Sequence, residues 1–201
     1  MEILFRFPGL YRFKRAMTRL FAVRSGWDPR AYLEQGLVLD LGCGPDESDT
    51  DLSGIKRVGI DVSVPFLRAA KCSSPSGYFV RASAEKLPFV DGAFQATFVS
   101  CVLHHIPVDT RLIIEEIRRV TREHLVLVEP LQSERGFPRW VKTLWWRMTD
   151  GGCAYLPESE WNELLAGWDQ VQRIEEGRLF KNTFRFIGSR TKDPAFEGSA
   201  Q

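Results

Sequence analysis

The stretch VLDLGCGPDESDTDLSGIKRVGIDVS (38–63) decides the fold of this chain. With Leu37 before it, this stretch covers two short apolar runs, LVLDLG (37–42) and RVGID (57–61). Gly42 ends the first run, and Gly44 follows two residues later. Continuous apolar runs are typical of strands that are buried on both faces, as in a parallel sheet. Glycines after such a strand allow a sharp turn and a close approach of the backbone to a ligand. The stretch therefore predicts a strand, a ligand-binding loop and a second strand.

The same alternation continues toward the C-terminus. Further strand-like runs occupy 78–82, 93–103 and 124–130, and helical patterns occupy 65–71 and 110–121. Because parallel strands require crossovers, which are usually helices, this alternation predicts an α/β fold. The helix over 110–121 is expected to turn one stripe of side chains inward: Leu112, Ile113, Glu116, Ile117 and Val120.

Other patterns lie outside this alternating region. Residues 10–22 predict an amphipathic helix with a basic face, and 29–35 predict a short helix with Asp28 as N-cap. Residues 137–148 place apolar side chains at helical spacing, and 157–168 predict a helix with Pro157 near its start. The alternating runs at 170–176 and 179–189, which a glycine separates, predict an antiparallel hairpin that ends the sheet.

Length and composition indicate an ordinary globular domain. The chain has 201 residues, and its 27 Lys and Arg nearly balance its 26 Asp and Glu, so there is no overall basic footprint for nucleic acid. No apolar run approaches the length of a membrane span, and arginines interrupt every candidate signal sequence. The four cysteines form no CxxC pair, which favours reduced thiols and a cytoplasmic location.

The loop after the first strand restricts the choice of ligand. A dinucleotide loop has the pattern GxGxxG, but Glu47 stands at the third glycine position, and Asp46, Asp49 and Asp51 surround it. These acids would repel phosphate groups, and no GK[ST] follows to make a P-loop. An acidic loop favours a ligand with an adenosine, positive charge and no phosphate.

An acidic residue at the end of the second strand supports a nucleoside ligand. Asp61 follows Asp40 by 21 residues, and in this position a carboxylate can accept hydrogen bonds from both ribose hydroxyls. Alternatively, both acids only cap loops. Their combination with the two glycines at this spacing favours a nucleoside site.

The ordered motifs resemble those of class I S-adenosylmethionine-dependent methyltransferases, especially the small-molecule (type 11-like) group. VLDLGCG resembles the first motif of that family, VGIDVS its acidic ribose motif, and residues 84–106 its adenine loop and fourth strand. Residues 112–130 are similar to its fourth helix and fifth strand, and the resemblance extends less clearly to Ser189. It implies a Rossmann-like three-layer sandwich with a seven-stranded, mostly parallel sheet, a C-terminal antiparallel hairpin and N-terminal helices.

The resemblance also implies a cofactor, S-adenosyl-L-methionine, and its contacts. The implied binding residues are Asp40, Gly42, Cys43 and Gly44 near the methionine part, Asp61 at the ribose, Val62, Ser83 and Ala84 at the adenine, and Ser100 through its carbonyl at the ammonium group. Three departures from the family pattern stand out. Ser83 replaces a frequent acid, Asp46 replaces a frequent third glycine, and Arg122-Glu123-His124 replaces a usual glycine pair.

Methyl transfer from a sulfonium needs mainly orientation of the acceptor, and a base only where the acceptor must lose a proton. His104 and His105 follow the fourth strand, so we consider them candidate catalytic residues, with Glu129 a weaker candidate. One histidine of the pair could instead simply order its loop. Adjacent histidines make no obvious chelate, so no metal site is expected.

This reading predicts a domain organisation and a class of partner. Residues 1–36 would form an N-terminal helical cap, 37–190 the S-adenosylmethionine-binding domain with a lid insertion at 131–157, and 191–201 a flexible tail. The expected partner is a small-molecule methyl acceptor. Two alternatives remain open: a non-catalytic scaffold of the same fold, and a peripheral membrane or nucleic-acid binder that acts through the basic N-terminal helix.

Overall fold

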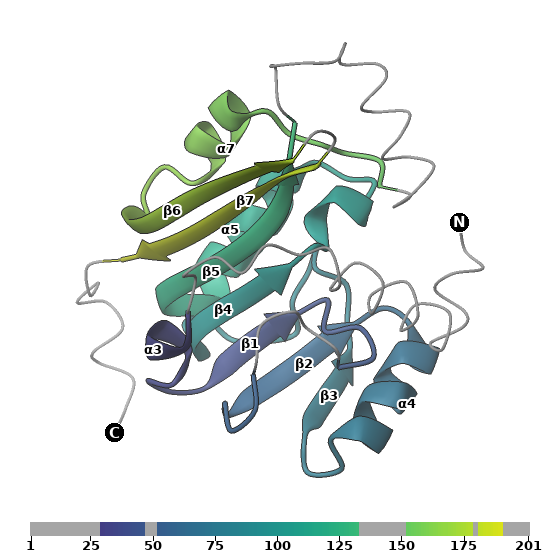
Figure 1. Cartoon of the computed structure of the whole chain (residues 1–201). Coiled ribbons are helices and arrows are strands. Elements are labelled where there is room, and N and C mark those ends of the chain that lie inside the picture. Colours follow the sequence, from purple (N-terminus) through teal and green to yellow (C-terminus); the bar gives the residue numbers. More distant parts are fainter. Residues whose placement is uncertain (1–28, 47–51, 133–151, 179–180, 191–201) are drawn as a thin grey trace.

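The computed structural model describes residues 29–46, 52–132, 152–178 and 181–190 (Figure 1). Its strands are β1 (Val38–Leu41), β2 (Arg57–Asp61), β3 (Tyr78–Arg81), β4 (Phe94–Ser100), β5 (Thr121–Leu131), β6 (Asp169–Arg178) and β7 (Lys181–Ser189). Its helices are α3 (Arg30–Leu33), α4 (Val64–Ser73), α5 (Thr110–Val120), α7 (Glu158–Leu164) and the 3₁₀ turn η1 (Leu103–His105).

The described strands form one sheet of seven in the order β3-β2-β1-β4-β5-β7-β6. Neighbouring strands from β3 to β5 are parallel, whereas β7 is antiparallel to both β5 and β6. The structure therefore confirms the predicted Rossmann-like architecture and its C-terminal antiparallel hairpin.

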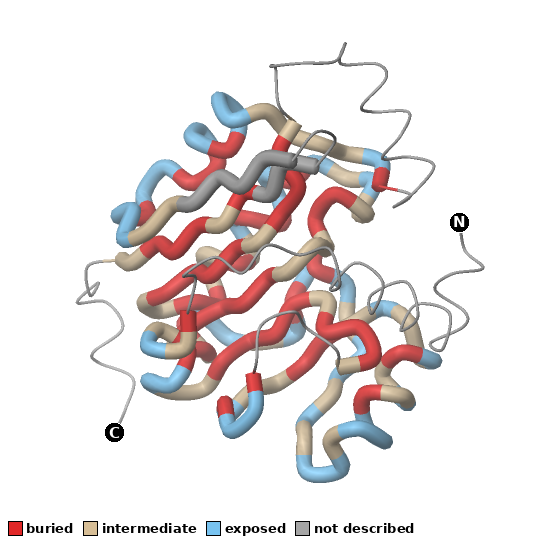
Figure 2. The backbone as a smooth tube through the Cα atoms, viewed as in Figure 1, coloured by how far each residue is buried: buried red, intermediate tan, exposed pale blue. Residues whose placement is uncertain are grey.

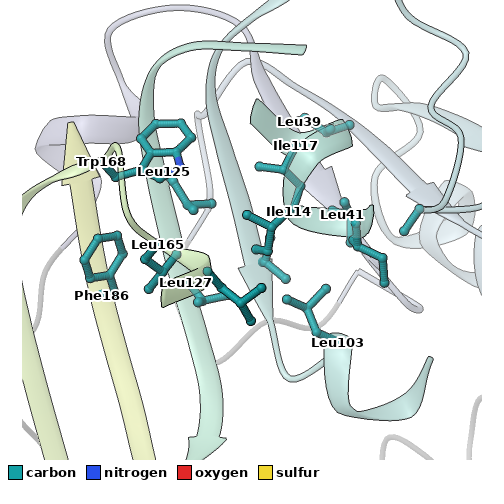
Figure 3. Close-up of a cluster of buried hydrophobic side chains, with 14 of the residues drawn as sticks. Leu39, Leu41, Leu103, Ile114, Ile117, Leu125, Leu127, Leu165, Trp168 and Phe186 are labelled. Atoms are coloured by element: carbon teal, nitrogen blue, oxygen red, sulfur yellow. The ribbon is translucent and has the colours of Figure 1, made fainter. Parts of the chain in front are cut away.

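The two faces of the sheet are covered by different elements. Side chains alternate along a strand, so Leu39 and Leu41 of β1 face one side and Val38 and Asp40 face the other. The larger core cluster lies on the Leu39 side, where α5 and the segment after α7 pack (Figure 3). The residues labelled there include Ile114 and Ile117 of α5, Leu165, Trp168, and Phe186 of β7. Figure 2 shows the buried residues concentrated along the central strands.

A smaller cluster covers the opposite face. Leu33 of α3 and Leu52 and Ile55, which precede β2, pack there against Val38 and Phe98. Among the described residues, the cover of this face comes from a four-residue helix and a connecting segment.

The inward face of α5 differs from the predicted stripe. Leu112 is 53% exposed, whereas Ile114, which the prediction left out, is buried beside Ile113 and Ile117. Glu116 does not enter the core, because its carboxylate accepts hydrogen bonds from the Leu87 N–H and from Arg119. The buried stripe of α5 is therefore shifted by about one position from the stripe that the sequence predicts.

Several element boundaries also differ from the predicted ones. The short helix begins at Arg30 with Pro29 as its N-cap, and no side chain caps it. The fourth strand ends at Ser100, because Cys101 takes a left-handed conformation (φ 56°) before η1. The fifth strand begins at Thr121, directly after α5, so residues 122–124 belong to the strand. The predicted helices at 10–22 and 137–148 lie outside the described residues, as do most of the predicted cap, lid insertion and tail.

Candidate functional site

The predicted ligand residues lie where the parallel strands end. Gly42 and Gly44 follow β1, Asp61 ends β2, and Ser100 ends β4. The chain moves outward from β1 to β2 and β3 on one side, and through β4 and β5 on the other. In open α/β sheets, ligands bind outside the carboxyl ends of the strands at such a switch point. The geometry at this point therefore decides what the site can hold.

The loop after β1 has an unusual backbone. Gly42, Gly44 and Asp46 all have positive φ values, of 69°, 56° and 63°. A Cβ on Gly42 would lie 2.4 Å and 2.6 Å from the two methyl groups of Val102, which follows β4. Gly42 is thus required both for the turn and for the close approach of the loops after β1 and β4. Asp46 keeps the left-handed conformation that a third glycine would provide, and Asp tolerates this conformation better than most residues do.

Asp61 links the second strand to the glycine loop. Its Oδ2 accepts a hydrogen bond from the Gly44 N–H (3.1 Å), and its Oδ1 accepts one from the Ser63 N–H (2.7 Å). Ser63 is the N-cap of α4 and accepts from the Phe66 N–H. Burial raises the pKa of Asp61, and the peptide donors of Ser63 and Gly44 oppose that rise. A carboxylate has about four acceptor positions, so Asp61 can also accept from a ligand hydroxyl.

The remaining predicted cofactor residues differ in what they can present. The Val62 side chain, directly after Asp61, is 62% exposed and offers an apolar surface. Ser83 is exposed, with its Oγ accepting from the Glu85 N–H, whereas the Ala84 side chain belongs to the core. Cys43 is buried. Ala84 and Cys43 can therefore meet a ligand mainly through their backbone atoms.

Asp40 has an internal partner on the face of the sheet below the glycine loop. Its Oδ2 lies 2.6 Å from Nη1 of Arg57, whose Nη2 pairs with Asp46. The side chains of all three residues are at least 86% buried. The sequence analysis did not predict a role for Arg57. A basic residue at the start of a strand that follows an acidic loop could have indicated an ion pair with that loop. The contact between Asp40 and Asp46 through Arg57 was not visible in the sequence.

Burial raises the pKa of Asp40 from 3.8 to about 6, although the Arg57 guanidinium opposes the rise; Asp46 and Asp61 add to it. A carboxyl whose pKa is higher in the folded state stabilises the fold below its unfolded pKa and loses that contribution as the pH rises. Relative to Asp40→Asn, we expect the wild type to lose on the order of 2–3 kcal/mol of unfolding free energy between about pH 4 and pH 6. Urea denaturation of both proteins at a series of pH values measures this; parallel stability curves would contradict it.

A second polar cluster lies at the ends of β4 and β5. Glu129 is fully buried, and its Oε1 accepts from the N–H groups of Val102 (2.7 Å) and Leu103 (2.9 Å). Its Oε2 lies 2.6 Å from Nδ1 of His104. This contact is a hydrogen bond, and which of the two atoms donates depends on the tautomer of the imidazole. Glu129 therefore holds both the η1 backbone and the orientation of the imidazole.

His104 and His105 are placed differently. His104 is only 3% exposed, and its ring packs on Tyr155 at 5.5 Å between centroids and on His105 at 4.0 Å. The His104 carbonyl accepts from the N–H groups of Cys153 and Ala154, so this residue orders the segment before α7. His105 is half-buried. Of the two candidate catalytic histidines, His105 is the more accessible.

The loop before β4 is held from α5. The Arg119 guanidinium donates to the carbonyls of Leu87 and Phe89 and to Asp91, while Glu116 accepts from the Leu87 N–H. These contacts hold residues 87–91, which begin three positions after the predicted adenine residues Ser83 and Ala84. The glycine loop itself is hydrogen-bonded to Asp61 and lies close to Val102, whose N–H donates to Glu129.

The described residues also bear on two other features, a metal site and a membrane-spanning helix. That part of the chain contains no group of three or more His, Cys, Asp or Glu residues placed to hold a metal ion. It also contains no helix with the length and apolarity needed to cross a membrane.

Comparisons with known proteins agree with this geometry. Residues 39–128 match a family model described as a methyltransferase domain. An uncharacterized methyltransferase from Synechocystis is 38% identical over 88 residues, which cover 42% of this chain and 42% of that protein. A demethylmenaquinone methyltransferase from Paenarthrobacter aurescens is 33% identical over 105 residues, 51% of this chain and 41% of that protein. The matched region therefore spans less than half the length of these relatives.

Solved structures share the fold over most of the chain. A SAM-dependent methyltransferase from Methanosarcina mazei has a TM-score of 0.67 at 21% identity, covering 82% of this chain and 97% of that one. A SAM-dependent methyltransferase from Thermotoga maritima, described as a possible histamine N-methyltransferase, has a TM-score of 0.71 at 16% identity, covering 94% and 99%. At these identities the likeness concerns the fold alone.

Proposed function

Since this chain belongs to the class I S-adenosylmethionine-dependent methyltransferase family, we propose that it transfers the methyl group of S-adenosylmethionine to a small-molecule acceptor. The observation that carries the proposal is the hydrogen bond between the Gly44 N–H and the Asp61 carboxylate. It places a glycine loop beside a carboxylate at the ends of two adjacent parallel strands, the arrangement in which such folds hold a ribose.

The residues present fit this cofactor. Asp61 retains acceptor capacity for ribose hydroxyls, and the exposed Val62 beside it gives a base an apolar surface. Asp40 and Asp46 share one cation, Arg57, so these three groups and Asp61 together sum to a charge of about −2 when the acids are ionised. A negative site favours a ligand with sulfonium and ammonium groups and disfavours phosphates.

The sulfonium supplies an already activated methyl group, so the protein mainly aligns the acceptor with it and excludes water. In this proposal Asp61 orients the ribose, Gly42 and Gly44 let the backbone approach the methionine part, and the Ser100 carbonyl accepts from the ammonium group. Glu129 fixes the imidazole of His104, and His105 lies at the more accessible end of this cluster. His105 is our candidate for contact with the acceptor.

The names of similar proteins support a small acceptor. One relative is named for demethylmenaquinone, and one structural neighbour is described as acting possibly on histamine. The two differ chemically, so the proposal goes no further than a small molecule as acceptor class. A scaffold of the same fold is the competing function. Membrane or nucleic-acid binding through residues 10–22, the lid at 131–157 and a cytoplasmic location stay predictions.

Calorimetry and a transfer assay test the proposal. We expect the purified protein to bind S-adenosylmethionine and S-adenosylhomocysteine, and to transfer a labelled methyl group to members of a panel of phenols, quinols and amines. Asp169→Ala, which removes an exposed carboxylate at the far edge of the sheet, is the control and should bind as the wild type does. No heat with either nucleoside would overturn the proposal. Binding without transfer to any panel member would favour the scaffold.

Alanine variants of His104 and His105 should have different effects on stability and on turnover. His104→Ala leaves the buried Glu129 without its imidazole partner, so we expect it to lose about 1–3 kcal/mol of unfolding free energy. His105→Ala should keep most of the stability and lower the turnover number, with S-adenosylmethionine affinity unchanged. Thermal unfolding, calorimetry and single-turnover kinetics on both variants measure this. Full turnover in His105→Ala would remove His105 from the acceptor site.

A further inference from the structure

The connection from β1 to β2 carries the glycine loop. Parallel neighbours in a sheet are generally joined through a helix. Here residues 42–56 join β1 to β2, and the described residues of that segment, 42–46 and 52–56, contain no helix. The second part packs on the sheet through Leu52 and Ile55, and the first part buries Cys43. The N–H groups of Cys43 and Gly44 hold the start of the glycine loop to β2, through the Ile60 carbonyl and the Asp61 carboxylate. The far end of the loop, at Asp46, has a different anchor.

Arg57 provides a polar anchor at that place. It is the first residue of β2, and its guanidinium pairs with Asp40 within β1 and with Asp46 at the end of the described loop. The other Asp46 oxygen accepts from the hydroxyl of Ser74, the C-cap of α4. One guanidinium thus connects two strands, the loop and, through Asp46, the end of a helix.

The burial of these groups shows that they depend on one another. The side chains of Asp40, Asp46 and Arg57 are only 7%, 9% and 14% exposed. A buried charge without a partner is strongly destabilising, so without Arg57 two carboxylates would face each other in a poorly hydrated place. Asp46 also has a left-handed backbone (φ 63°), which persists only where its surroundings hold it. Loss of Arg57 would therefore favour protonation of Asp40, whose pKa burial already raises, or movement of the loop that carries Asp46. Only movement of the loop also relieves the backbone of Asp46.

We propose that Arg57 is a positioning residue of the cofactor site, which holds the Gly42–Asp46 loop in its binding shape by tying Asp46 to Asp40 beneath it. The inference rests on the proposed function for its effect on cofactor binding. Its effect on the loop does not depend on any ligand. Arg57 acts through the loop backbone, so we assign it no contact with the cofactor.

Hydrogen exchange on the ligand-free protein tests the loop directly. The N–H groups of Cys43, Gly44 and Asp46 donate to the Ile60 carbonyl, the Asp61 carboxylate and the Cys43 carbonyl. In Arg57→Gln we expect these amides to exchange roughly tenfold to a hundredfold faster, the range that loss of charged hydrogen bonds produces. Amides of β7 that pair with β5 should keep their wild-type rates. Arg173→Gln, which removes an ion pair with Glu158, is the matched control.

A charge-balanced variant distinguishes positioning from general destabilisation. Arg57→Gln alone should weaken S-adenosylmethionine binding by a similar factor, and Arg57→Gln combined with Asp46→Asn should recover part of the affinity, because only one buried carboxylate then remains. Unchanged loop exchange in a folded Arg57→Gln would overturn the inference. So would equally faster exchange in the β7 amides. If the wild type binds no nucleoside while the loop amides respond as expected, only the proposed function fails.

Discussion

Replacing Asp61 with alanine is expected to weaken S-adenosylmethionine binding by roughly tenfold to more than a hundredfold, because each hydrogen bond to an ionised group contributes about 1.5–3 kcal/mol. The variant loses the ribose acceptor and also releases the Gly44 N–H that Asp61 Oδ2 holds at 3.1 Å. Titration calorimetry at fixed salt measures the two affinities. S-adenosylhomocysteine carries the same ribose, so its affinity should fall by a similar factor.

The interpretation of this result depends on the fold remaining intact. Asp61 also accepts from the Ser63 N–H at the start of α4, so thermal unfolding of the variant must accompany the titrations. Asp169→Ala again serves as the control for loss of a carboxylate. Wild-type affinity in a folded Asp61→Ala protein would place the ribose elsewhere and remove the main support for the proposed site.

Replacing Gly42 with alanine should have a still larger effect. A Cβ there would meet the Val102 methyl groups at 2.4 Å and 2.6 Å, and the residue would have to keep a φ of 69°. The left-handed backbone costs about 1–2 kcal/mol, and overpacking typically costs a further 1–3 kcal/mol. Because the proposed cofactor site depends on the turn at Gly42, we expect no measurable S-adenosylmethionine binding and a lower melting temperature.

Two variants separate the causes of this loss. Gly54 lies in the same crossover with a φ of 78°, but a Cβ added there meets nothing within 4 Å. Gly54→Ala should therefore show the backbone strain alone and keep cofactor binding. Adding Val102→Ala to Gly42→Ala should restore part of the binding, because it removes the clashing methyl groups. Undiminished binding in the single Gly42→Ala variant would show that the loops after β1 and β4 do not approach each other as described.

Local sequence patterns were sufficient for most of the fold. The apolar runs at 37–42 and 57–61 lie where β1 and β2 form, and the alternating runs at 170–176 and 179–189 became the antiparallel hairpin. The face of α5 was less predictable. Leu112 is apolar but exposed, since the stripe that contacts the sheet is set by how the helix lies on its neighbours. The spacing of apolar residues predicts that α5 has one buried face, but it predicts less precisely which residues lie at the middle of that face.

The candidate site, like the fold, was predictable only in part. Glycines and acids at the ends of strands were recognisable because their chemistry depends on local position: Gly42 on a turn and Asp61 on the end of β2. The partners of these residues were not recognisable, since Arg57 meets Asp46 across 11 positions and Glu129 meets His104 across 25.

The sequence by itself therefore determined the order of most of the elements, and it predicted a ligand loop and a class of ligand that its charge favours. Only the tertiary structure decided that Asp40 faces Arg57 beneath the loop, that Val102 restricts Gly42, and that Glu129 orients His104. The physical reason is that backbone turns and strand burial follow from neighbouring residues, whereas the pairing of buried charges depends on which strands lie side by side. That adjacency is a property of the sheet order, which no local pattern encodes.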